Sequence, residues 1–346
     1  MYKSQIDPQD MFKGIYRFAD QIQEALLIGA QINLQYDYSE CENIVVAGMG
    51  GSAIGGDVVE TIAHQELKIP FYVNRNYKLP NWVDGKSLVI CSSYSGNTEE
   101  SLSAYEDALK KGAMICSIST GGQLSEKIQS KGFDLITIPG GFQPRAALAY
   151  SFVPMLYLLR KIGFISNSLI DDLSNSITSL EKKRETYSVG DTSNPIFKMA
   201  KNIYGMIPII YGITDTTGVV ALRWKSQLCE NSKMLAYHNE IPEMNHNEIV
   251  GWHNNPDLLS ELSVIWLRNK SDNERVRKRQ DITITLLNDI DIMQHEVNAE
   301  GANNIERLLN LINYGDWLSY WCAILHNTDP STVEKINKLK KALKEI

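Results

Sequence analysis

The chain has 346 residues, of which 43% are hydrophobic and 22% are charged, and 41 acidic against 34 basic residues give a formal net charge of −7. This composition excludes a chain that is mainly disordered, and the length suggests two domains. The acidic balance argues against nucleic-acid binding driven by the overall field of the protein, and the two basic stretches, 268–280 and 331–346, are typical of solvated helix faces.

The sequence carries no signal that predicts a membrane or secreted location. Its longest uncharged apolar runs, such as residues 207–213, fall short of the ~20 residues that cross a bilayer. The N-terminal residues lack the apolar stretch of a secretory signal. Five scattered cysteines without a C-x-x-C pair are typical of buried thiols in a reducing compartment. We therefore expect a cytoplasmic protein with no membrane partner.

The first half of the chain predicts a parallel sheet flanked by helices. Apolar residues three and four apart indicate an amphipathic helix over 10–32. From residue 43, β-branched runs alternate with helix-like stretches, which is the pattern of βαβ units. A further helix is expected over 145–162. The five expected strands are NIVVAG, IPFYVN, SLVICSS, AMICSIS and DLITIP.

The same pattern resumes after a polar segment, residues 167–194, which is the candidate junction. Strands are expected at IPIIYGIT, LAYHNEI, SVIWLRN and IDIMQHEV, and helices over 217–233, 273–287, 303–326 and 330–346. The predicted fold is therefore α/β with two domains, 1–155 and 156–346, each a parallel-stranded sheet flanked by helices in an αβα sandwich.

A glycine-rich turn, GMGGSAIGG at residues 48–56, follows the first expected strand. Glycines there let backbone amides approach an anion at a helix N-terminus. Gly48, Gly50 and Ala53 also satisfy the G-x-G-x-x-G/A dinucleotide pattern. The next strand ends on NRN, however, where that pattern has an acidic residue. Arg75 suits a 2′-phosphate, so an NADP-linked oxidoreductase is the weaker alternative.

A second turn, SSYSGNTEES at residues 92–101, follows the third expected strand. Ser93, Ser95 and Thr98 supply three hydroxyls at a helix start, where free backbone N–H groups also favour an anion. Ordinary N-capping is the structural alternative, because Ser and Thr are preferred caps. Three hydroxyls on one turn, beside the glycine-rich turn, favour a phosphate pocket.

Two further segments concentrate charge. Arg145 follows a proline at an expected helix start, where the helix dipole disfavours a cation, so it suggests an anionic partner; a structural pair with a carboxylate is equally plausible. Residues 229–252 hold several Glu and His without H-E-x-x-H or H-x-H spacing, so we expect no metal site. Composition does not select one acid or one histidine from this segment.

The motifs GMGGSAIGGD, SSYSGNTEES, PRAALAYS and ENSKMLAYHNEIPEMNHNEIVGW resemble, in this order and spacing, those of the bifunctional phosphoglucose/phosphomannose isomerases, which are built from two sugar isomerase (SIS) domains. The resemblance runs from about residue 43 to the C-terminus. It implies reversible isomerisation of glucose 6-phosphate and mannose 6-phosphate with fructose 6-phosphate through a cis-enediol intermediate, without a metal or nucleotide cofactor.

The resemblance also implies roles for individual residues. Glu230 would be the base that moves a proton between C1 and C2, because a carboxylate can take and return the same proton. Arg145 would stabilise the negative charge of the enediolate. The phosphate would be held by Gly51, Ser52, Ser93, Ser95 and Thr98.

Ring opening is the remaining step that the resemblance assigns. His246 would take part in it and would come from the partner subunit, which implies a homodimer with shared active sites. A lysine of the C-terminal helix would assist. Lys340 fits the motif best, with Lys338 and Lys341 as alternatives.

Two other functions stay open at this point. A non-catalytic SIS regulator that binds a sugar phosphate would keep the 92–101 turn, but it need not retain Glu230, His246 and a C-terminal lysine together. An isomerase that is specific for only one of the two epimers would carry almost the same motifs.

Overall fold

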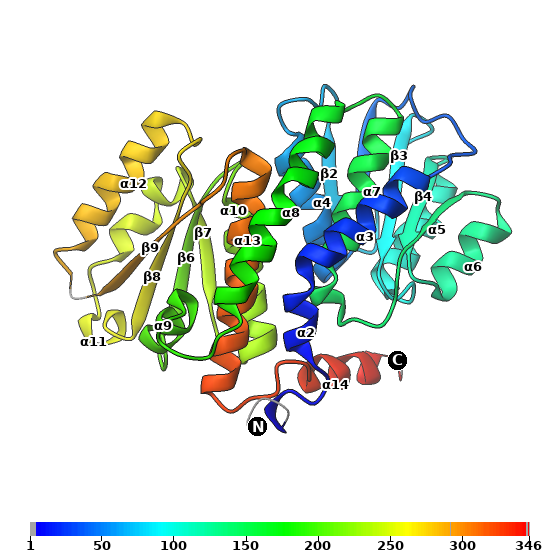
Figure 1. Ribbon diagram of the computed structural model, residues 1–346. Coiled ribbons are helices and arrows are strands. Elements are labelled where there is room, and N and C mark those ends of the chain that lie inside the picture. Colours follow the sequence, from blue (N-terminus) through cyan, green and yellow to red (C-terminus); the bar gives the residue numbers. More distant parts are fainter. Residues whose placement is uncertain (1–4, 291, 344, 346) are drawn as a thin grey trace. The chain divides into compact units, whose positions relative to one another are not determined.

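The computed structural model describes residues 5–290, 292–343 and 345 (Figure 1). Contacts within the chain group them into two compact units. We call Arg17–Glu181 with Asn303–Glu306 the first-sheet unit, and the described residues of Met1–Tyr16, Lys182–Ala302 and Arg307–Ile346 the second-sheet unit. The domain limits 1–155 and 156–346 stay a prediction.

The first-sheet unit contains a five-stranded parallel sheet in the order β2-β1-β3-β4-β5. All five predicted strands are confirmed. The central strand β3 is buried along its whole length, as expected for a parallel sheet covered on both faces. The strands are β1 Asn43–Ala47, β2 Phe71–Asn74, β3 Ser87–Ser93, β4 Met114–Ser119 and β5 Asp134–Thr137.

Helices cover both faces of this sheet. On one face, Val45 and Val89 pack with Tyr105 of α5 and Leu124 of α6. On the other, α4 approaches so closely that a Cβ at Gly56 would lie 3.1 Å from Val46. Helix α7 packs in turn against α3 and α4. The helices are α3 Phe18–Gln31, α4 Gly50–Ala63, α5 Glu99–Lys110, α6 Gly122–Ser130 and α7 Leu148–Lys161.

Three predicted helices differ from the structure near their starts, and one of them, predicted over 330–346, begins at Glu334. The helix predicted over 10–32 is divided at Arg17 into α2, Met11–Tyr16, which belongs to the second-sheet unit, and α3. The helix predicted over 145–162 begins only at Leu148 and follows a separate 3₁₀ turn, Pro144–Ala146. Arg145 therefore lies before α7 rather than in its first turn.

The second-sheet unit contains a four-stranded parallel sheet in the order β7-β6-β8-β9. This repeats the order β2-β1-β3-β4 of the first sheet, so the chain winds in the same sense twice. All four predicted strands are confirmed. The strands are β6 Ile207–Ile213, β7 Tyr237–Ile241, β8 Leu262–Arg268 and β9 Met293–Asn298.

Buried aromatic side chains fill the core of this unit. Tyr211 stacks on Trp266 with ring centroids 4.6 Å apart, and Leu287 of α12 packs on the same cluster. No helix in the described ranges is both long and apolar enough to cross a membrane.

The helices of the second-sheet unit, besides α2, are α8 Asn167–Tyr187, α9 Pro195–Asn202, α10 Gly218–Gln227, α11 Pro256–Leu259, α12 Glu274–Leu287, α13 Asn304–Leu325 and α14 Glu334–Leu343. Of these, α8 and α13 begin in residues of the first-sheet unit.

Candidate functional site

The two predicted phosphate turns lie side by side in the first-sheet unit. Strands β1 and β3 are neighbours, and the chain runs from β1 to β2 on one side and to β3 on the other. This reversal is the switch point at which parallel α/β sheets bind ligands, outside the carboxyl ends of the strands. A Cβ at Gly48 would lie 2.9 Å from the carbonyl oxygen of Ser92, so the turns that follow the two strands are in contact.

The glycine-rich turn leads directly into α4. Gly50 has a φ of 52°, a left-handed conformation that favours glycine. A Cβ at Gly51 would lie 2.9 Å from the carbonyl oxygen of Pro144, so a larger residue there would displace backbone. Because Met49 in the N-cap position makes no side-chain cap, the amides at the start of α4 can face an anion.

Hydroxyl groups join the glycine-rich turn to the serine turn. Buried Ser52 accepts a hydrogen bond at 3.2 Å from the backbone N–H of Tyr94. Ser93 and Thr98 share a hydrogen bond of 3.0 Å between their hydroxyls, whereas the exposed Ser95 accepts one of 3.3 Å from the N–H of Asn97. Thr98 is the N-cap residue of α5, yet its side chain makes no cap bond. The N-capping interpretation therefore fails at Thr98.

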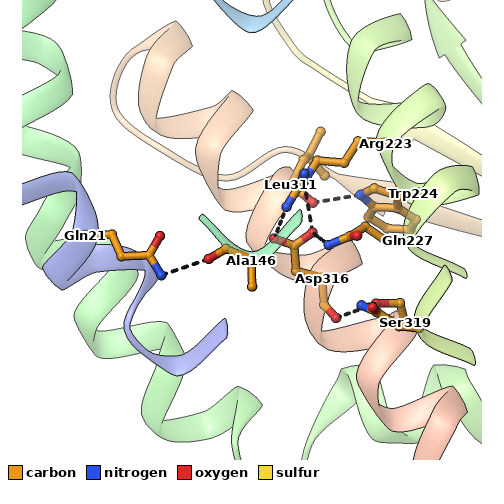
Figure 2. Close-up of polar contacts among 9 residues, drawn as sticks. Gln21, Ala146, Arg223, Trp224, Gln227, Leu311, Asp316 and Ser319 are labelled. Carbon is orange, nitrogen blue, oxygen red and sulfur yellow. Dashed lines mark hydrogen bonds and ion pairs between the residues drawn. The ribbon is translucent and has the colours of Figure 1, made fainter. Parts of the chain in front are cut away.

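Arg145 lies against the same turn. A Cβ at Gly51 would be 3.6 Å from the Cα of Arg145. The 3₁₀ turn is held by Gln21, which donates a 2.9 Å hydrogen bond to the carbonyl oxygen of Ala146 (Figure 2). The Arg145 side chain is buried, and a buried cation needs anionic or hydrogen-bonding partners. The six predicted residues of this unit therefore lie on three adjoining turns, and Ser95 is the one whose hydroxyl contacts none of the other five.

The dinucleotide interpretation loses its main support. Arg75 forms an ion pair with Asp57 of α4. Its guanidinium is therefore already engaged by a carboxylate of the chain. The residue that sequence analysis offered for a 2′-phosphate is not free for that role.

Glu230 lies in the second-sheet unit on a π-helical turn. The helix predicted over 217–233 ends as α10 at Gln227 and continues as this turn, Leu228–Ser232. Glu230 is half-buried, and the turn ends on Lys233, which has a φ of 55°. Such π-helical turns are rare and often occur at functional sites.

His246 is exposed on a loop that side-chain hydrogen bonds hold. It ends the 3₁₀ turn Glu243–His246 that follows β7. Two residues later, Glu248 accepts hydrogen bonds from the Tyr211 hydroxyl and from the side-chain amide of Asn239. Trp252 also donates to Tyr211, at 3.1 Å. These hydrogen bonds therefore hold in place the loop that carries His246.

The C-terminal lysines lie on α14, where the described side chains are exposed. Lys340 shares this exposure with Lys338 and Lys341, so the structure does not choose among them. Glu230, His246 and Lys340 come from three separate segments of the unit. Among the described residues, no group of three or more His, Cys, Asp or Glu is arranged to hold a metal ion.

In the second sheet, the helix start that corresponds to the start of α4 is that of α10, and the carboxylate of Glu240 lies beside it. A Cβ at Gly218, the first residue of α10, would lie 2.6 Å from the carboxylate of Glu240. A carboxylate is stabilised at the positive end of a helix dipole. Sequence analysis did not single out Glu240 for this place, because its position depends on the pairing of β7 with β6.

Sequence analysis also missed a buried polar network beside Glu230. Asp316 of α13 pairs with Arg223 and accepts a hydrogen bond from Gln227, both on α10. The sequence does contain one sign of this network, because Asp316 is the single charged residue in the apolar stretch 310–325 and a buried charge needs a partner.

Known proteins resemble this chain over nearly its whole length. A relative from Caldicellulosiruptor bescii, named bifunctional phosphoglucose/phosphomannose isomerase, is 44% identical over 97% of this chain and 99% of its own. A relative of the same name from Aquifex aeolicus is 36% identical over 89% of this chain and 92% of its own. Residues 192–343 match the family described as bacterial phospho-glucose isomerase C-terminal SIS domain.

The fold has solved counterparts as well. The C-terminal domain of glucosamine-fructose-6-phosphate aminotransferase from Francisella tularensis superposes with a TM-score of 0.70, covering 93% of this chain and 97% of that one, at 15% identity. This likeness supports the predicted α/β fold with two SIS-type sheets. The identity and coverage of the full-length relatives go further, and by them the chain belongs to the bifunctional phosphoglucose/phosphomannose isomerase family.

Proposed function

We propose that this chain is an aldose-ketose isomerase that interconverts glucose 6-phosphate and mannose 6-phosphate with fructose 6-phosphate. The observation that carries the proposal is the pair of adjoining turns at the switch point between β1 and β3. Helix amides and hydroxyls at this edge of a parallel sheet support the binding of a phosphate group there. The names of the relatives supply the sugar and the reaction.

The phosphate would be bound without a lysine. Ser52 accepts its hydrogen bond from Tyr94, so its own proton stays available for a phosphate oxygen. In the pair formed by Ser93 and Thr98, one hydroxyl donates to the other, which leaves the second proton for the ligand. Ser95 is exposed beside them, and Gly51 lets the backbone approach.

The chemical step would be proton transfer by Glu230. Its carboxylate would remove the proton from C2 of the open-chain aldose and return it to C1 of the cis-enediol, which gives the ketose. Negative charge develops on the enediolate oxygen during this transfer. Arg145 would stabilise that charge as a fixed cation, an effect that a largely buried guanidinium can supply strongly.

Ring opening would require His246 and a lysine of α14, with Lys340 as our assignment. The exposure of His246 on an anchored loop suits a group that completes the site of a neighbouring subunit. We therefore include a homodimer with shared active sites in the proposal. Side chains can carry all of these proton transfers, so it includes no metal or nucleotide cofactor, and the unpaired cysteines suit a cytoplasmic location.

A non-catalytic regulator is the second candidate, and the π-helical turn at Glu230 argues against it. A binding module has no need to hold a half-buried carboxylate on a disfavoured turn. Retention of Glu230, His246 and Lys340 in one chain also favours catalysis.

The test is direct. Purified protein receives either glucose 6-phosphate or mannose 6-phosphate, with a chelator and without nucleotide, and fructose 6-phosphate is measured. Formation from both aldoses supports the proposal. Formation from one alone identifies an epimer-specific isomerase, and binding without turnover identifies the regulator. A requirement for added metal would overturn the cofactor-free reaction.

A further inference from the structure

Glu230 is flanked on both sides by contacts to one turn of α13. Before it, Gln227 donates a hydrogen bond of 2.9 Å to the carboxylate of Asp316. After it, Asn231 donates one of 2.9 Å to the hydroxyl of Ser319. Ser319 in turn donates to the carbonyl oxygen of Asp316, at 2.7 Å. The residue before the π-helical turn and Asn231 within it therefore both contact a single turn of α13, and Figure 2 shows the contact between Gln227 and Asp316.

Asp316 forms a bidentate pair inside this contact. Arg223 donates from Nε at 3.0 Å to Oδ1 and from Nη2 at 2.7 Å to Oδ2. The side chains of Arg223 and Asp316 are only 3% and 5% exposed. Planar guanidinium and carboxylate groups that meet in this way are fixed in angle as well as in distance. With Gln227, three donors converge on one carboxylate.

The two helices also approach closely next to this pair. A Cβ at Gly315 would lie 2.1 Å from Nε1 of Trp224. That nitrogen donates a 2.9 Å hydrogen bond to the carbonyl oxygen of Leu311. Helix α10 is thus held against α13 along its last turns, directly before the π-helical turn begins.

A buried ion pair adds little to the free energy of unfolding by itself. Well-packed apolar side chains of similar volume often stabilise a protein as well or better, since a buried pair must overcome the loss of hydration of both charges. A π-helical turn, in contrast, needs outside contacts to persist against the ordinary α-helix. The contacts at Asp316 and Ser319 supply them at the residues that bracket Glu230.

We propose that Asp316 is a positioning residue, which fixes the π-helical turn so that Glu230 is held at the angle required for proton transfer. The inference rests on the proposed function, because it takes Glu230 as the base. Asp316 acts through Arg223 and Gln227 and touches no reacting atom. A small displacement of a base can lower a rate on the order of 100-fold, so the effect should fall on kcat.

The main test replaces the pair by apolar residues, as Arg223→Met with Asp316→Leu. We expect a folded protein of near-normal melting temperature, with kcat lowered about 10- to 100-fold and KM changed little. The deuterium isotope effect on kcat for the substrate labelled at C2 should rise, because proton transfer becomes rate-limiting. Asp316→Asn alone would leave the Arg223 charge buried without a counter-ion, so we expect it to lower the melting temperature as well as kcat, unlike the apolar pair.

Two further variants separate positioning from stability. Ser319→Ala removes the contact to Asn231 without burying or freeing a charge, so it should fold and still lower kcat several-fold. Leu287→Ala makes a cavity in the core of the same unit, away from α10, and serves as the control with a lowered melting temperature. Its kcat and isotope effect should stay normal.

A normal kcat and isotope effect in both the apolar pair and Ser319→Ala would overturn the inference. It would also be overturned if Leu287→Ala lowered kcat as much as these variants do, because the loss would then follow from lower stability. A higher KM with unchanged kcat would overturn it as well. If the unmodified protein isomerises no sugar phosphate, or if Glu230→Gln remains active, the proposed function or its base has failed instead.

Discussion

The hydroxyl oxygens of Ser93 and Thr98 lie 3.0 Å apart, across the turn that joins β3 to α5. The contact draws the Thr98 hydroxyl away from the cap bond that its position would otherwise favour. An N-cap residue that does not cap leaves the helix amides open to another acceptor. This arrangement supports the proposal that Ser93 and Thr98 bind the phosphate of the substrate.

Removal of the Thr98 hydroxyl should therefore weaken substrate binding. Thr98→Val keeps the shape of the side chain, and we expect KM for the sugar phosphate to rise about 10-fold, the scale of one hydrogen bond to a charged group. The change in kcat should be smaller. Steady-state kinetics and the competitive inhibition constant of inorganic phosphate measure the effect. Thr98→Ser is the matched control, and a normal KM in Thr98→Val would exclude the hydroxyl as a phosphate ligand.

Glu230→Gln should remove the base and keep the shape of the site. Since general-base catalysis contributes about 10²- to 10⁴-fold, we expect kcat to fall by at least about 100-fold. The dissociation constant of a sugar phosphate should change little. Exchange of the C2 proton with solvent deuterium, followed by NMR, reports the same step independently. Rapid exchange in the variant would move the role of base to another residue.

Shared active sites predict complementation between inactive variants. If His246 serves the neighbouring subunit, equal mixing of Glu230→Gln and His246→Ala chains, refolded together, should give about a quarter of normal activity, because half of the dimers of a two-fold symmetric protein then hold one intact site. The control mixes Glu230→Gln with the double variant Glu230→Gln/His246→Ala, which should restore nothing. Activity that stays at the level of the separate variants indicates a site within one chain.

Two partly buried histidines predict how stability depends on pH. Burial lowers the pKa of His238 on β7 and of His295 on β9 below the usual value. The unfolded chain therefore takes up protons at these positions at a higher pH than the folded chain does. Stability should hold above about pH 6.5, the unperturbed histidine pKa, and fall as the pH drops below it towards the folded pKa values.

Replacement of the histidines tests this dependence. Urea unfolding from pH 8 to pH 5 should show a flatter loss of stability for His238→Gln with His295→Gln than for the unmodified chain. His64→Gln is the matched control, because His64 is exposed and directly follows α4. If the free energy of unfolding fell equally steeply with pH in all three proteins, groups other than these histidines would cause the loss of stability in acid.

Gly218→Ala should displace the Glu240 carboxylate. A Cβ at Gly218 would lie 2.6 Å from this carboxylate, which ends a flexible side chain and can shift, so we expect the free energy of unfolding to fall by only about 1 kcal/mol. Gly251→Ala is the control, since a Cβ at that position meets no atom within 4 Å. Denaturant unfolding measures both. A second change, Glu240→Ala, should reduce the loss in Gly218→Ala if the clash with the carboxylate is its cause.

The strands were predictable because their signal is local. Runs such as NIVVA and SLVICSS carry the β-branched pattern of a buried parallel strand in their own residues. The hydroxyl cluster of residues 93–98 was equally visible, since its members are neighbours in the sequence.

The end of α10 was not predictable in the same way. Nothing in residues 217–233 distinguishes an α-helix from one that closes in a π-helical turn. The decisive contacts come from Asp316 and Ser319, close to 90 residues further along the chain, and sequence periodicity does not report such pairings. The division at Arg17 likewise coincides with the boundary between the two units, which the local pattern of residues 10–32 does not report.

The two sheets share one winding order, yet Glu240 makes them chemically unequal. An internal repeat with two vacant helix starts would bind a phosphate at either, and a substrate could then enter in two directions. The carboxylate at Gly218 repels a second anion from that place. If the proposed function holds, this acidic side chain leaves the helix start after β1 as the one suited to a phosphate, although the two sheets have the same winding order.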